Sequence, residues 1–298
     1  MIGYLRKLAL SFNSTFLFKY LPRVVDYLTS ISTLIASKKL KGANVECILI
    51  DSTVLAHSVT HETAWVNTGK TLWGDVEIDT GYAARIPVHD DRDNSDATRS
   101  IRYLPGIASL ARRGYLTLAT SSELRDEQWS HPAGRFRGYG LYDFSLFRNI
   151  KFKAINNPQF SVVFGASHLG LHNIREQRWK KLESNADPLF HELVSVLGPK
   201  NTQDAWHIAT AENNNCFCFL TMDFQLIRNV QAQAKNKTIK SLKTLILSPE
   251  EFGRRFSIIP INFRLFSYHN ASFPVIHREN WPDSKRQRRS RKASPPKY

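Results

Sequence analysis

The sequence contains few cysteines, and their spacing offers no way to pair them. Three cysteines occur among 298 residues, and an odd number without framework spacing excludes a fold that depends on disulfides. Cys216 and Cys218 lie two residues apart on a predicted strand, so both side chains point to the same face. Packing explains this pair better than metal ligation does. The cysteine content fits a reducing cytoplasm, which is the location that we expect.

A continuous apolar run long enough to cross a bilayer is also missing from the N-terminal segment. Arg6 and Lys7 precede apolar residues there, but Asn13 and Lys19 interrupt them. A membrane-spanning helix needs about 20 predominantly apolar residues, and no small-residue cleavage site follows clearly. We therefore predict that residues 1–44 form an amphipathic helical segment packed on the domain or on a partner. A membrane is not the partner that we expect.

Acidic residues are scarce relative to basic ones. The chain has 26 Asp and Glu against 41 Lys and Arg, which gives a formal net charge of +15. Seven of the positive charges and no acid lie in residues 284–298, and subtracting these seven from 15 leaves +8 on the rest of the chain. The seven are Lys285, Arg286, Arg288, Arg289, Arg291, Lys292 and Lys297. A basic body and a basic tail favour nucleic acid as a partner. We expect the tail to contact phosphates without sequence preference, and a nuclear signal is the alternative if the host is eukaryotic.

Short apolar runs alternate with helical patterns between residues 45 and 256, the segment that we expect to form the main domain. The predicted strands are residues 45–51, 114–120, 216–220 and 242–247. The predicted helices are residues 98–113, with Pro105 as a point of division, and residues 121–129, 172–183, 187–197 and 202–215. This alternation favours an α/β fold with a parallel sheet and helices on both faces. Two insertions are expected, a polar and irregular one near 60–96 and a Gly- and aromatic-rich one near 130–170. A C-terminal extension of loops and basic tail occupies 257–298.

Four acids share one kind of position in this pattern. Asp51 ends the first strand, and Asp223 lies just beyond the strand "CFCFL". Glu123 and Asp204 lie in the first turns of two predicted helices. In a parallel sheet, strand ends and the following helix starts meet at one edge, so the four carboxylates can converge. An acid in the first turn of a helix is often only a cap, but convergence favours a site for Mg²⁺ or Mn²⁺, since these ions prefer oxygen ligands.

The stretches "ILIDSTVL", "LATSSEL", "DAWHIATA", "FLTMDFQLI" and "LILSPEEF", taken together, resemble the PIN domain (PilT N-terminus-like). This is a family of metal-dependent nucleases common in bacterial toxin–antitoxin pairs and in RNA processing. The resemblance covers about residues 45–256, with two insertions. It implies a three-layer α/β/α sandwich around a parallel sheet, and an endoribonuclease that leaves a 5′-phosphate and a 3′-hydroxyl.

Residue by residue, the resemblance implies that Asp51, Glu123, Asp204 and Asp223 hold one or two Mg²⁺ or Mn²⁺ ions. The long gaps on both sides of Glu123 leave Asp126 and Glu127 as substitutes for it. Hydroxyls next to the acids would hydrogen-bond to the carboxylates or to metal-bound water. These hydroxyls belong to Ser52, Thr53 and Thr221.

Other motifs admit more than one interpretation. Arg135 and Arg137 are interleaved with aromatic residues, a pattern that suits single-stranded nucleic acid as well as a hairpin that packs its rings inward. His57 and His61 have i, i+4 spacing, but no Glu stands where a zinc peptidase motif needs one. His207 is interpreted as a structural residue of its helix.

The sequence also leaves the function within this fold open. The favoured function is RNA hydrolysis by metal-activated water, and a structure-specific DNA nuclease is the alternative enzyme. A non-catalytic RNA-binding scaffold is the alternative to an enzyme. An antitoxin-like or assembly partner and a homo-oligomer are both compatible with the insertions.

Overall fold

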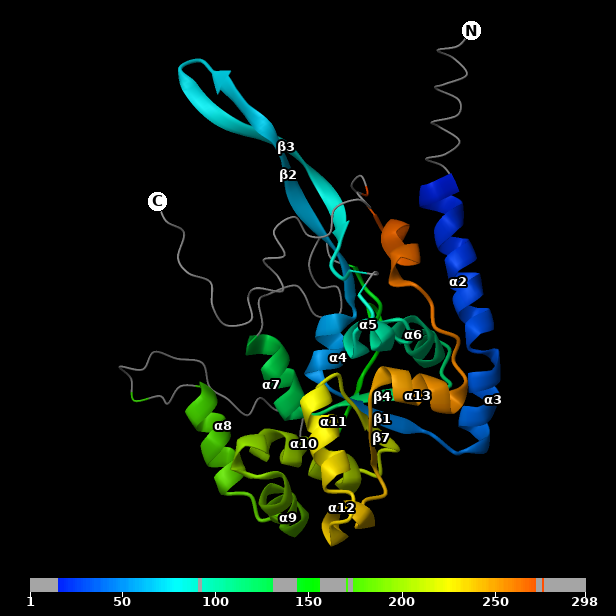
Figure 1. Ribbon diagram of the computed structural model, residues 1–298, viewed down its shortest axis with the longest axis vertical. Helices are drawn as coiled ribbons and strands as arrows, with labels where there is room; N and C mark the ends of the chain where they lie inside the picture. Colours follow the sequence, from blue (N-terminus) through cyan, green and yellow to red (C-terminus); the bar gives the residue numbers. More distant parts are fainter. Residues whose placement is uncertain are drawn as a thin grey trace.

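A central sheet of five short parallel strands organises the computed structural model, which describes residues 16–90, 93–130, 144–155, 170, 174–271 and 275 (Figure 1). The strands are β1 (Cys47–Ile50), β4 (Thr117–Thr120), β6 (Lys153–Ala154), β7 (Cys218–Leu220) and β8 (Leu245–Leu247). Their order across the sheet is β6-β4-β1-β7-β8, and each pairs with its neighbours in parallel. The predicted α/β class with a parallel sheet is therefore confirmed.

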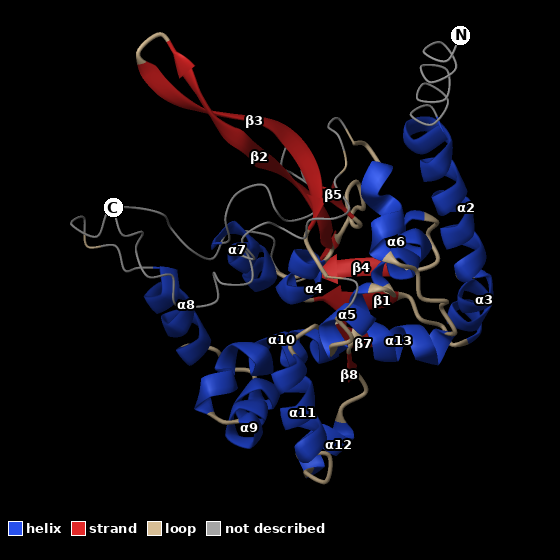
Figure 2. Cartoon of the chain, turned by 45° about the horizontal axis from the view of Figure 1, so that its top comes forward, coloured by secondary structure: helices blue, strands red, loops and turns tan. Residues whose placement is uncertain are grey.

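Helices cover both faces of the sheet because its strands alternate their apolar side chains between two cores. Ile48 and Ile50 of β1 belong to one core, and Leu49 belongs to the other. The first core contains residues of α2 (Leu21–Ser32), α3 (Leu34–Gly42), α4 (Ser52–His57), α5 (Asp96–Ile101), α6 (Leu104–Arg112) and α13 (Pro249–Phe256). The second contains residues of α7 (Ser122–Ser130), α8 (Ile174–Glu183), α9 (Pro188–Leu197), α10 (Thr202–Asn213), α11 (Phe224–Ala232) and α12 (Lys237–Ser241). Figure 2 shows the two groups of helices on opposite sides of the strands.

The helix predicted over 98–113 is divided, as Pro105 suggested. Helix α5 ends at Ile101 and α6 begins at Leu104, with the proline in its first turn. A proline lacks the backbone N–H that a helix interior requires, but it is tolerated where a helix starts. The division lets the two short helices pack separately against the first core.

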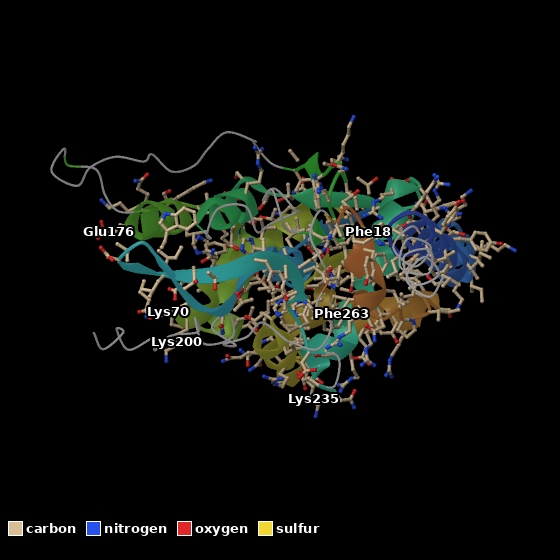
Figure 3. All side chains as sticks on the ribbon, turned by 90° about the horizontal axis from the view of Figure 1, so that it is seen from above. Phe18, Lys70, Glu176, Lys200, Lys235 and Phe263 are labelled. Atoms are coloured by element: carbon tan, nitrogen blue, oxygen red, sulfur yellow. The ribbon has the colours of Figure 1, made fainter. Side chains whose placement is uncertain are left out.

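Residues 60–96 were expected to be irregular, but most of them form a long antiparallel hairpin. Strand β2 (Val59–Trp73) pairs with β3 (Val76–Pro87) and also with β5 (Phe144–Ser145). The hairpin turn uses Gly74, whose φ of 62° is the left-handed conformation that glycine adopts without strain. The ribbon extends away from the body and carries Lys70 toward its outer end (Figures 1 and 3). Polar residues and glycines within both strands concealed this hairpin in the sequence.

The N-terminal segment is helical from Phe16 onward, as predicted. A π-helical turn, η1 (Phe16–Tyr20), leads into α2. Helix α2 contacts α6 and the 3₁₀ helix η5 (Phe263–Tyr268), and it buries Val25 and Thr29 on that side. Its opposite side exposes larger apolar side chains, those of Val24, Tyr27, Leu28 and Ile31. None of the described helices combines the length and the apolar character that crossing a membrane requires.

The second insertion contributes to the sheet itself. Strand β6 adds the edge strand beside β4, with Ala119 opposite Lys153. This strand was not predicted from the sequence, because two residues are too few to show a periodicity. A further short 3₁₀ turn, η4 (Pro199–Asn201), precedes α10.

Candidate active site at the edge of the sheet

The C-terminal ends of β1 and β7 form the point where the sheet changes its winding direction. The chain passes from β1 to β4 on one side, whereas it passes from β7 to β8 on the other. Ligands of open α/β sheets bind in the crevice at such a point, outside the strand ends. Asp51 directly follows β1, and Thr221 directly follows β7. Two of the predicted site residues therefore lie side by side at this switch point.

Asp51 is a buried carboxylate held by hydroxyls rather than a helix cap. It is the residue before α4, yet its side chain makes no capping hydrogen bond to that helix. Instead, Oδ2 accepts hydrogen bonds from Thr53 Oγ1 and, at 2.6 Å, from Thr221 Oγ1. Ser52 Oγ lies 3.3 Å from Oδ1. Burial raises the pKa of Asp51, and the hydroxyls and the nearby His207 act in the opposite direction.

The two threonines also connect the strand ends. Thr53 Oγ1 accepts a hydrogen bond of 3.0 Å from the backbone N–H of Met222, and Thr221 Oγ1 accepts one of 2.9 Å from that of Asp223. Each hydroxyl therefore donates to Asp51 and accepts from the segment after β7. The structure thus gives Thr53 and Thr221 the hydrogen bonds to a carboxylate that the resemblance implied.

Asp204 is the least compensated of the acids. Its carboxylate is half-buried in the first turn of α10, and no hydrogen bond or ion pair reaches it from the described residues. Burial raises the pKa of Asp204 to about 6; the charge of His207 lowers it, and the charges of Asp223, Asp51 and Glu127 raise it further. The carboxylates of Asp51, Glu127, Asp204 and Asp223 therefore lie close enough to interact electrostatically.

Asp223 caps α11 with one of its two oxygens. Oδ1 accepts hydrogen bonds of 2.9 Å from the backbone N–H groups of Gln225 and Leu226. No hydrogen bond to Oδ2 comes from any residue that the structure describes. The cap fixes the carboxylate and leaves the second oxygen able to bind a ligand.

On helix α7 the structure separates Glu123 from the site and brings Glu127 into it. Glu123 Oε1 accepts a hydrogen bond from Lys181 Nζ of α8 at 2.5 Å. Burial raises the pKa of Glu123, but the hydrogen bond and charge of Lys181 and further hydrogen bonds to the carboxylate together exceed it, so the pKa is lowered overall. Glu127, one turn later, accepts hydrogen bonds from Ser52 Oγ at 2.7 Å and from Gln203 Nε2. Of the acids considered for this position, Glu127 is the one that meets the other carboxylates; the side chain of Asp126 lies outside the described residues.

His207 is more than the structural residue that the sequence suggested. Its Nε2 lies 2.8 Å from Glu127 Oε1, and its side chain is almost fully buried. Burial lowers the pKa of His207, but the charge and hydrogen bond of Glu127, together with the charges of Asp51 and Asp204, raise it to about 9. The pKa of Glu127 falls to about 2, because the effect of His207 and the hydrogen bonds exceeds that of burial. The spacing Asp204–His207, three residues apart on one helix, was the available signal, since such residues share a face.

The remaining predicted residues are either elsewhere or outside the described residues. His57 and His61 do not form a pair on one helix, because α4 ends at His57 and His61 lies on β2. Their ring nitrogens bond to Thr53 O and to Ser267 Oγ, respectively. All eight predicted nucleic-acid contacts lie outside the described residues, and so does the last tail lysine, Lys297. The eight are Arg135, Arg137, Lys285, Arg286, Arg288, Arg289, Arg291 and Lys292.

The donor chemistry fits a hard divalent cation. The site presents carboxylate oxygens from several segments and one histidine, which is engaged with a glutamate. A half-buried carboxylate without partners, next to other acids, is stabilised when a cation joins it. As they stand, however, no three His, Cys, Asp or Glu side chains among the described residues form a group that could hold a metal. The acids are neighbours, but they are not already arranged as a complete ligand set.

The comparison with known proteins found no match for the chain among protein-family models, curated proteins or solved structures. The resemblance to the PIN domain therefore stays a prediction from the sequence motifs.

Proposed function

We propose that this protein is a metal-dependent nuclease that hydrolyses phosphodiester bonds at the edge formed by β1 and β7, with RNA as the favoured substrate. The observation that supports this most is Asp204, a half-buried carboxylate that lacks a hydrogen-bond partner among the described residues and lies near three further acids. An acid in such surroundings is costly to keep charged unless a cation neutralises it. The position at the crevice of the sheet adds to this support.

Asp51, Asp204 and Asp223 would hold the ion, because each has an oxygen that could serve as a ligand. Mg²⁺ or Mn²⁺ would supply Lewis-acid chemistry there, activating water and stabilising charge on the phosphoryl oxygens. Thr53 and Thr221 keep the Asp51 carboxylate oriented through their two hydrogen bonds. The cap on α11 does the same for Asp223.

Glu127 and His207 form a charged pair beside these acids. The imidazolium offsets part of the negative charge, and it fixes the glutamate that faces Ser52. Glu127 therefore has a positioning role in this proposal, in place of the ligand role predicted for Glu123. The net charge of +15 supports a polyanionic substrate.

A non-catalytic RNA-binding scaffold is the second candidate. It is favoured by the engagement of Glu127 with His207, Ser52 and Gln203 and by the incomplete ligand set. The two candidates differ in whether bound nucleic acid is cut.

A cleavage assay separates them. Labelled single-stranded RNA, single-stranded DNA and double-stranded DNA are incubated with the protein in Mg²⁺, Mn²⁺ or EDTA. Asp51→Asn and Asp204→Asn are compared with Asp187→Asn, a matched change at an acid that caps α9. The nuclease proposal expects metal-dependent cutting that only the first two variants lose. Binding of RNA without cutting in every metal would overturn it in favour of the scaffold.

A further inference from the structure

A second candidate site lies apart from the acidic edge. A cavity of about 400 Å³ opens between α2, α6, the turn after β5 and the end of η5. Its volume falls in the range of pockets that hold small organic ligands. None of the four carboxylates at the sheet edge lines it.

The cavity is lined by three arginines and one acid. Arg112 and Arg113 come from the end of α6, and Arg148 comes from the turn after β5. The acid is Asp26 of α2, and it faces His269 Nε2 at 3.1 Å. The lining therefore carries an excess of positive charge.

The arginines retain donors for a ligand. Arg112 donates one hydrogen bond to the backbone oxygen of Leu146, and Arg113 donates to Ser30 O and Thr33 Oγ1 at 3.4 and 3.3 Å. Each guanidinium has five N–H donors, so these bonds leave others unused. Among the described residues, no carboxylate forms an ion pair with any of the three. The side chain of Arg148 makes no hydrogen bond to any described residue.

The rest of the lining suits a ligand that carries an organic group as well as an anionic one. Phe144 and Phe266 form an apolar wall, and the hydroxyl-bearing residues Ser30 and Ser145 line the polar part. Guanidinium groups match the geometry of phosphate oxygens through paired hydrogen bonds. An apolar wall beside such a group accommodates the organic portion of a phosphate ester.

We propose that the cavity between α2, α6 and η5 binds a phosphate monoester through Arg112, Arg113 and Arg148, with its organic part against Phe144 and Phe266. A free mononucleotide and the phosphorylated end of a nucleic acid share this chemistry. The cavity does not depend on the acidic edge, so the proposal holds or fails independently of the nuclease function.

Calorimetric titration in EDTA tests it with five probes: inorganic phosphate, adenosine 5′-monophosphate, adenosine, a short 5′-phosphorylated RNA, and the same RNA without the phosphate. The Asp51→Asn protein is titrated beside wild type, so that failure of the nuclease proposal does not affect the result. Saturable binding of adenosine 5′-monophosphate is expected in both, and adenosine is expected to bind at least about tenfold more weakly because charge-assisted bonds are lost. Competition by 5′-phosphorylated RNA alone would identify a nucleic-acid end as the ligand, and its absence would identify a mononucleotide.

Three arginine variants make the test specific. Arg148→Gln and Arg112→Gln are expected to weaken binding about tenfold or more, since each removes a charged donor. Arg254→Gln is the control, because Arg254 is an exposed arginine of α13 outside the cavity. Arg148 has no side-chain hydrogen bond to a described residue that the change would remove, so its variant is expected to melt at the temperature of wild type. Equal affinity in Arg148→Gln, Arg112→Gln and Arg254→Gln, or no saturable binding of either phosphate probe, would overturn the proposal.

Discussion

His207 Nε2 lies 2.8 Å from Glu127 Oε1 in a largely buried ion pair at the C-terminal edge of the sheet. This contact joins α7 to α10 and sets Glu127, rather than Glu123, beside Asp51 and Asp204. This pair therefore helps to determine which acid of α7 belongs to the candidate site, together with the contact between Lys181 and Glu123. The first two predictions concern Glu127 and His207.

Glu127→Gln is expected to lower RNA cleavage by about 10- to 100-fold, the range for residues that orient metal ligands. The amide keeps the size of the side chain but removes its negative charge, leaving His207 unpaired. Glu123→Gln is the matched control one turn away; it removes the negative charge that pairs with Lys181 and is expected to retain cleavage within a few-fold. Initial cleavage rates under identical Mn²⁺ conditions measure both. If the Glu123 variant lost cleavage and the Glu127 variant retained it, Glu123 rather than Glu127 would be the acid of α7 that the site needs.

The ion pair should also make stability depend on pH. The pKa of Glu127 is lowered from 4.5 to about 2, so its contribution is complete above pH 4.5 and is lost as pH falls through about 2. The pKa of His207 is raised from 6.5 to about 9, so its contribution is complete below pH 6.5 and is lost as pH rises through about 9. His207→Gln should therefore cost about 3 kcal/mol of unfolding free energy between these limits. Urea unfolding of both proteins at pH 5.5 and at pH 9.5 checks this, and a cost that is the same at both would refute it.

Asp223 has two roles that different substitutions can separate. Asn is as good an N-cap as Asp, whereas Ala is a poor one and costs about 1 kcal/mol. We therefore expect Asp223→Asn to keep the stability of the protein and Asp223→Ala to lose about 1 kcal/mol. Both should lose Mn²⁺ affinity, because neither carries the free carboxylate oxygen. Wild-type Mn²⁺ affinity in Asp223→Asn would show that this residue is only a cap.

Thr221 connects Asp51 and Asp223 through one fully buried hydroxyl. Thr221→Val keeps the shape but leaves the Asp51 carboxylate without this donor, at a cost of about 1–3 kcal/mol in unfolding free energy. Mn²⁺ affinity should fall about 10- to 100-fold, since the carboxylate is no longer oriented. Thr221→Ser retains the hydroxyl and should retain the affinity. If the valine and serine variants bind Mn²⁺ equally, the hydroxyl does not position Asp51.

The sequence predicted the parts of the site that follow local patterns. Asp51 and Asp223 were visible because an apolar strand ends in an acid, and Asp204 was visible because it opens a helix. The choice between Glu123 and Glu127 could not be made in this way, since residues four apart share one face of a helix. It depends on Lys181 and His207, which approach from helices distant in the sequence.

The long hairpin and β6 were missed for a related reason. Strand β2 mixes polar and apolar residues and contains Gly69, so its alternation is weak. Strand β6 has two residues and is held in place by its neighbour β4. Pairing between distant segments creates both elements, and local propensity carries little information about it.

Titration with Mn²⁺ tests the central claim most directly, because it asks whether the acids at the sheet edge hold a divalent cation. Wild type, Asp51→Asn, Asp204→Asn and Asp187→Asn would be compared by calorimetry in metal-free buffer. Saturable binding that Asp187→Asn retains and that the other two variants lose is the predicted result. Equal binding in all four proteins, or none in wild type, would contradict the account.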